Sequence, residues 1–179
     1  MKHINIDLHV GIGLLKLGMN PEQMKAAVLQ QCKELVPTGN HRLAISEDRE
    51  INGIQYRRYF CNHLFFLIAF KGDSAVEIGF NKLIKDTAVI SLYGMDAFAT
   101  PAEQLILALK EFSSCRYDSD DELLSTEYEF DEIGIRLWRQ DAFHPKLLLD
   151  EDYMNMMYRV IDDMREFLYF DIVAVRSKD

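Results

Sequence analysis

The sequence is poor in residues that cross-link a chain or anchor it in a membrane. Its three cysteines, Cys32, Cys61 and Cys115, are odd in number and have no CxxC spacing. They cannot all pair within one chain, so we expect a reducing compartment, the cytoplasm. The longest apolar run, Leu64–Phe70, is far shorter than the ~18 residues of a membrane span. Met1–Val10 alternates polar and apolar residues, unlike a secretory leader, so no membrane partner is expected.

Acidic residues outnumber basic residues only in the last third of the chain. Through Phe112 there are 12 acidic and 12 basic residues, whereas from Ser113 onward there are 17 acidic and 8 basic residues. This part therefore carries the whole net charge of −9. It would repel a phosphate backbone, which disfavours nucleic acid as a partner, and it would attract a basic protein. Acidic residues that only aid solubility would account for the same composition.

A complete catalytic motif is also missing. The stretch GIGLLKLGM, Gly11–Met19, has glycines at positions 11, 13 and 18. It lacks the spacing of a dinucleotide-binding loop and the Lys-Ser/Thr of a phosphate loop. We interpret these glycines as turn residues between a strand and a helix. No cofactor is expected.

Two chemical alternatives remain open. In a strand, His3, Asp7 and His9 would fall on one face, and Asp7 with His9 could begin a metal site. A small metal-dependent hydrolase is therefore the rival hypothesis, although His41, His63 and His144 have no ligand spacing. A strand with polar residues on its solvent face would account equally well for His3, Asp7 and His9. Cys61 and His63 lie too close in a tight turn for nucleophile–base geometry, which favours buried, inert cysteines.

What the sequence does contain is a repeated pattern of strand, turn and helix. Asn20 followed by Pro21 predicts a helix start, and Pro37–Asn40 predicts its end. About 80 residues later, Ala88–Leu92 predicts a strand, and Thr100–Glu103 predicts a second helix start with a capping box. After each helix come a polar-aromatic strand, a short turn, an apolar strand and a further strand.

We therefore predict an α+β fold made of a duplicated helix-plus-antiparallel-sheet unit. The units span residues 1–85 and 86–179 and pack as a single compact body. An extra helix is predicted in the second copy at Asp150–Leu168, with Met157, Ile161, Met164 and Leu168 facing inward and Tyr153 outward.

The chain resembles a group of small bacterial cytoplasmic proteins with tandem G-x-G-x-L-x-L-G-M helix-plus-sheet units. The matching residues are Gly11, Gly13, Leu15, Leu17, Gly18, Met19, Gly134, Ile135, Leu137 and Trp138. Some members are immunity proteins that block secreted antibacterial toxins, and the unit also resembles that of the beta-lactamase inhibitor protein. The resemblance implies binding rather than catalysis, and it assigns no binding residue.

The leading hypothesis is thus an immunity protein, not an enzyme, that neutralises a basic toxin domain through an acidic surface, and the toxin that best fits this charge is a nuclease. The expected contact residues are nine acids, with four aromatic anchors. They are Asp118, Asp120, Asp121, Glu122, Glu127, Glu129, Asp150, Glu151 and Asp152, with Tyr117, Tyr128, Trp138 and Tyr153. A non-catalytic regulatory module is a further alternative.

Overall fold

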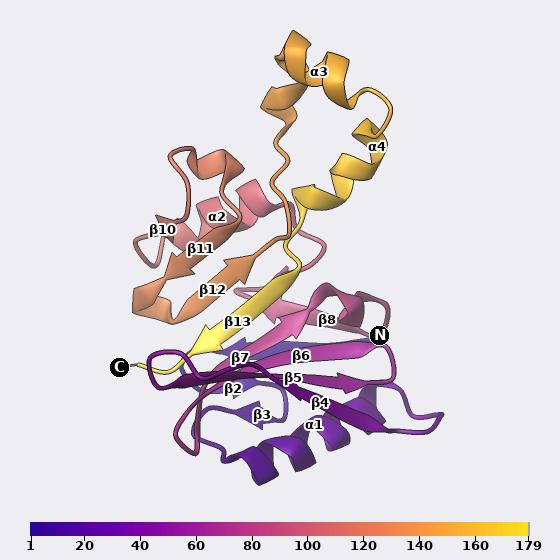
Figure 1. Ribbon diagram of the computed structural model, residues 1–179, viewed down its shortest axis with the longest axis vertical. Helices are drawn as coiled ribbons and strands as arrows, with labels where there is room; N and C mark the ends of the chain where they lie inside the picture. The colour runs from indigo at the N-terminus through magenta and orange to yellow at the C-terminus, as the bar shows by residue number, and fades with distance from the viewer. Residues whose placement is uncertain (179) are drawn as a thin grey trace.

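The computed structural model describes residues 1–178, and its fold is α+β, as predicted (Figure 1). The first half contains these elements: β1 (Lys2–Asp7), β2 (Gly11–Ile12), β3 (Leu15–Lys16), α1 (Pro21–Leu35), β4 (Leu43–Glu47), β5 (Ile54–Cys61), β6 (Leu64–Lys71), β7 (Ser74–Asn81) and the 3₁₀ helix η1 (Lys82–Asp86).

The second half also has one long helix followed by four strands, but only two strands precede its helix where three precede α1, and it adds an insertion before its last strand. Its elements are β8 (Ala88–Leu92), β9 (Met95–Asp96), α2 (Ala102–Lys110), β10 (Arg116–Tyr117), η2 (Glu122–Leu124), β11 (Glu127–Phe130), η3 (Asp131–Ile133), β12 (Ile135–Trp138), η4 (Pro145–Leu149), α3 (Glu151–Met157), α4 (Ile161–Met164), η5 (Arg165–Leu168) and β13 (Ile172–Arg176).

One eight-stranded sheet contains strands of both halves. Its order is β10-β11-β12-β13-β7-β6-β5-β4, so that the last strands of the two halves, β7 and β13, meet at the centre. They pair antiparallel, with Ala174 opposite Gly79 and Arg176 opposite Glu77. Moving outward from this seam, the strands of each half follow in reverse chain order, from β7 to β4 on one side and from β13 to β10 on the other. A duplicated unit would give this arrangement.

A second sheet, β3-β2-β1-β8-β9, joins the beginnings of the two halves. Here β1 and β8 run parallel, with Ile4 opposite Ile90. Antiparallel pairing alone was predicted from the sequence, and this prediction was wrong for the β1–β8 pair. Parallel neighbours need a long crossover connection, and the whole first unit supplies it.

A single buried cluster lies between the large sheet and the two long helices. It includes Met24 and Val28 of α1, Leu105 and Leu109 of α2, and Phe80 of β7, all fully buried. Alternation along the strands turns one face of the large sheet toward this core and leaves the other for polar side chains.

The starts of the two helices differ. Asn20 caps α1 as predicted, accepting from the backbone N of Gln23 at 2.9 Å, and the Gln23 side chain returns the bond at 3.0 Å. At α2 the predicted capping box is absent, because the helix begins one residue later, at Ala102, with Pro101 in the cap position and no side-chain cap.

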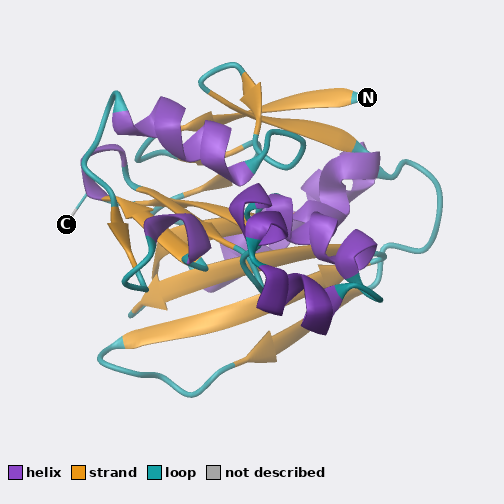
Figure 2. Ribbon diagram, turned by 90° about the horizontal axis from the view of Figure 1, so that it is seen from above, coloured by secondary structure: helices purple, strands orange, loops and turns teal. Residues whose placement is uncertain are grey.

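Residues 141–169, between β12 and β13, project from the body and are called the arm below (Figure 1). Seen from above, the helices of the arm lie nearest the viewer (Figure 2). The predicted single helix Asp150–Leu168 is wrong: the chain forms α3, turns, and continues as α4 and η5. A straight helix of that length would extend about 28 Å and would leave its apolar stripe without a second layer.

The break also changes which side chains are covered. Met164 is buried, as predicted, but Met157, Ile161 and Leu168 are only half-buried. Among the described residues, no helix is long and apolar enough to cross a membrane.

Candidate interaction site

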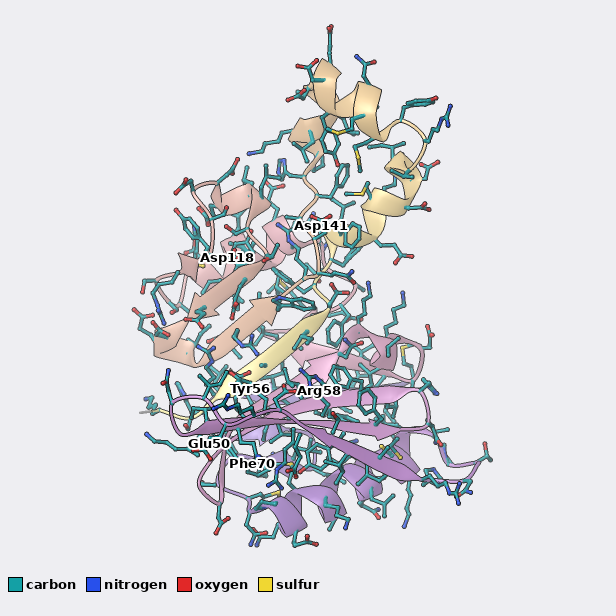
Figure 3. The ribbon with its side chains drawn as sticks, viewed as in Figure 1. Glu50, Tyr56, Arg58, Phe70, Asp118 and Asp141 are labelled. Atoms are coloured by element: carbon teal, nitrogen blue, oxygen red, sulfur yellow. The ribbon has the colours of Figure 1, made fainter. Side chains whose placement is uncertain are left out.

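The acidic residues expected to face a partner fall into two groups, and the larger one lies on β11 and on the loop between β10 and β11. Asp118 of this loop is labelled in Figure 3. Most of this group binds the chain's own side chains. The pairs are Asp118 with Thr126, Asp121 with Lys146, Glu122 with Lys110, Glu127 with Arg136, and Glu129 with Arg116 and Arg176. Asp120 is exposed and forms no ion pair within residues 1–178. Much of the negative charge here is therefore neutralised internally.

Glu127 and Glu129 belong to an ion network on the polar face of the large sheet. At its centre is Glu77, whose side chain is 4% exposed and accepts from Arg136 Nε at 3.1 Å and Arg176 Nε at 2.7 Å. Burial alone would lower the pKa of Arg136, but the neighbouring Glu77 carboxylate outweighs it and raises that pKa. A cavity of about 630 Å³ lies beside the network, lined partly by Tyr56, Glu77 and Arg176.

The charged groups of this network pair with one another, so we assign it a structural role. Glu77 comes from β7 of the first half, whereas Arg136 and Arg176 come from β12 and β13 of the second. The ion pairs therefore cross the seam between the halves. At the centre of the network, Glu77 is paired with both Arg136 and Arg176.

The four expected aromatic anchors lie in different environments. Tyr117 is 44% exposed, whereas Trp138 and Tyr153 are half-buried. Tyr128 is fully buried, and its hydroxyl donates to the backbone oxygen of Glu122. As an anchor Tyr128 is a wrong prediction, because alternation along β11 points it into the core while Glu127 and Glu129 point outward.

The second acidic group lies on the arm. Asp150, Glu151 and Asp152 form the start of α3 and are exposed. The Asp150 carboxylate caps the helix by accepting from the backbone N of Tyr153 at 2.9 Å. Over residues 141–169 the chain carries seven acidic and three basic residues. The arm thus carries a net negative charge, whereas four of the six acids of the β10–β11 region, Asp121, Glu122, Glu127 and Glu129, are paired with basic side chains.

The arm also exposes apolar side chains. Leu149 is 88% exposed, Met156 is 74% exposed and Tyr158 is 58% exposed. None of the three belongs to the apolar stripe that the sequence predicts for this segment, so they were not predicted as contact residues. The run of three leucines at 147–149, directly before three acids, was the available signal.

The metal alternative finds no support in this geometry. Strand β1 ends at Asp7, so His9 lies outside the strand with a φ of +56°. Its ring nitrogens face the backbone oxygens of Arg176 at 3.2 Å and Glu132 at 3.1 Å, while Asp7 pairs with Lys16 at 3.0 Å. The described residues contain no group of three or more His, Cys, Asp or Glu side chains placed to hold a metal ion.

Two of the three cysteines, Cys32 and Cys61, are buried, and Cys115 is partly exposed. Cys32 of α1 and Cys61 of β5 are fully buried next to each other, and burial together with the Cys61 contact raises the pKa of Cys32. Burial raises the pKa of Cys115 to about 11. Thiols held protonated in this way are poor nucleophiles.

Comparisons with known proteins found no matching family model, no matching curated protein and no matching solved structure.

Proposed function

We propose that this protein is an immunity protein, a non-catalytic inhibitor that binds a basic toxin domain, most simply a nuclease, with its arm. One observation carries the proposal: the arm projects from the body and combines exposed Leu149, Met156 and Tyr158 with a net negative charge. The resemblance to toxin-neutralising proteins is consistent with it.

The two kinds of side chain would have different tasks in the complex. Apolar and aromatic groups that enter a partner's pocket dominate the binding energy of an interface. Charges at the rim mainly accelerate association and select against like-charged partners. We therefore assign affinity to Leu149, Met156 and Tyr158, and steering to Glu151 and Asp152.

The direct test is co-expression of this chain with the C-terminal domain of the protein that the neighbouring upstream reading frame encodes. That domain should arrest growth alone and be neutralised by the chain. Replacing Leu149, Met156 and Tyr158 together by serine should weaken the purified complex at least ~100-fold, because truncating a central anchor costs about 2 kcal/mol or more. Isothermal titration measures this loss.

A matched control replaces three exposed apolar residues of the body, Ile51, Leu83 and Leu107, by serine. These are 68%, 49% and 59% exposed, so the loss of apolar surface is comparable. The control should bind as the wild type does. Equal binding by both triple variants would refute the arm as the contact, and an upstream domain that is harmless or not neutralised would refute the immunity role itself.

The acidic residues should control the rate of association. In the Glu151→Gln, Asp152→Asn variant, the association rate constant at low salt should fall about tenfold with little change in dissociation. Raising the salt concentration should slow the wild type toward the variant. Stopped-flow measurements at two ionic strengths test this, and a rate constant that depends on neither charge nor salt would contradict it.

A further inference from the structure

A separate cavity of about 220 Å³ lies where the arm joins the body. Its wall is formed by the first turn of α2, by Leu123 and by the two ends of the arm. These ends contribute Phe143 to Pro145 on one side and Leu168 on the other. Ile106, Phe143 and Leu168 give it a largely apolar lining. It takes no part in the exposed surface of the arm described above.

Arg139, which lines this cavity, is 2% exposed and has no carboxylate partner within salt-bridge distance among residues 1–178. Its acceptors are neutral: the backbone oxygens of Ser125 at 2.9 Å, Leu123 at 2.9 Å and Phe167 at 3.1 Å, and the hydroxyl of Tyr128 at 3.2 Å. Burying a guanidinium without a counter-charge is costly. Nη1 has two N–H groups and one such acceptor, so one of its N–H groups has no hydrogen-bond acceptor among residues 1–178.

The α2 helix supplies a second set of donors at the same wall. Residues 101–104 line the cavity, and the helix starts there without a side-chain cap. The first N–H groups of a helix have no partner within it and carry partial positive charge. A buried cation and an uncapped helix start thus meet at one apolar cavity, and both favour an anion.

One carboxylate, Glu103, also lies in the wall. His144 Nδ1 accepts from the backbone N of Lys146 at 3.0 Å, so its Nε2 carries a hydrogen and donates to Glu103 Oε2 at 3.1 Å. Glu103 is exposed and held by this bond, whereas Arg139 is enclosed.

We propose that this cavity binds a small carboxylate with a compact apolar body, such as an aryl or short alkyl carboxylic acid. The carboxylate meets the free N–H of Arg139 and the start of α2, and the apolar body packs against Phe143, Ile106 and Leu168. An apolar cavity of about 150 Å³ holds benzene, so this larger one accommodates a ring and its acid group. The inference is independent of the proposed toxin partner.

The test is an NMR titration of the intact ¹⁵N-labelled protein with phenylacetate and hexanoate, using phenylacetamide as the uncharged control. Saturable shifts are expected at the amides of Ala102, Glu103 and Gln104. Phenylacetamide should bind about tenfold more weakly or worse, because it loses the charge-assisted hydrogen bond. No saturable shift, or equal affinity for phenylacetate and phenylacetamide, would overturn the proposal.

Two tryptophan variants locate the site without removing Arg139. Leu168→Trp fills the cavity from its half-buried rim and should abolish the shifts. Leu83→Trp adds the same bulk at an exposed residue of η1 outside the cavity and should leave binding unchanged. Undiminished phenylacetate binding by the folded Leu168→Trp variant would place the ligand elsewhere and overturn the assignment.

Discussion

Replacing Gly11 by alanine is expected to lower the free energy of unfolding by roughly 4 kcal/mol, among the largest effects of any single substitution. A Cβ at this position would lie 2.1 Å from the backbone oxygen of Leu15 and 2.9 Å from the Cα of Lys16. Both atoms belong to β3, which pairs with β2 through Gly11 itself, so neither can move without opening the hairpin. Urea unfolding followed by circular dichroism measures the loss.

The matched control is Gly18→Ala, in the same stretch. Gly18 has a φ of +82°, and an added Cβ would meet no atom within 4 Å. Its cost is backbone strain alone, about 1 to 2 kcal/mol. Equal costs at the two positions would show that strain, and not the close approach of β2 and β3, is why glycine is needed at position 11.

This pair of variants also decides how the Gly11–Met19 stretch should be understood. The sequence was sufficient to interpret its glycines as turn residues, since local spacing and the following Asn20–Pro21 cap pointed to a strand, a turn and a helix. The close backbone contact at Gly11 could not be predicted, because it depends on which strand pairs with β2.

The same division holds for the fold as a whole. The duplication, α1 and the hairpins β5–β6 and β11–β12 follow from local periodicity and turn residues. The pairing of β7 with β13 and the parallel β1–β8 pair join segments more than 80 residues apart, and no local pattern specifies such partners. The capping box predicted at Thr100 is absent because the helix begins one residue later than predicted. A cap depends on the exact first residue of a helix, which local patterns do not fix.

The candidate site was harder to predict than the fold. Composition correctly located the excess of acidic residues after Ser113, but charge counts do not show which acids are paired. The structure divides them into an internally neutralised group around Glu129 and a free group at Glu151. The buried Tyr128 was misassigned for a related reason: an aromatic residue in a strand gives no indication by itself of which face it occupies.

Replacing Glu77 by glutamine is the second change expected to have a large effect, lowering the free energy of unfolding by about 3 to 5 kcal/mol. Glutamine preserves the shape of the side chain but removes its charge, which leaves the Arg136 and Arg176 guanidiniums with reduced compensation in a largely buried site. The control Glu47→Gln removes one carboxylate from an exposed pair with Arg57 and should cost less than about 1 kcal/mol. Chemical denaturation of both variants measures the difference.

A triple variant separates the cost of breaking the network from the stability it provides. Replacing Glu77 by leucine and both Arg136 and Arg176 by methionine removes every charge at the centre of the seam. Buried ion pairs often contribute little net stability relative to apolar residues of similar volume, so the triple variant should be more stable than Glu77→Gln alone, even though it carries three changes. If the triple variant is instead the less stable of the two, the ion pairs themselves hold β7 against β13. If the triple variant regains the free energy of unfolding lost in Glu77→Gln, the ion pairs serve mainly to fix how the two halves align. An apolar seam of small residues such as Gly79 and Ala174 would tolerate a shifted strand register. Glu77, held between two arginines, does not tolerate that shift.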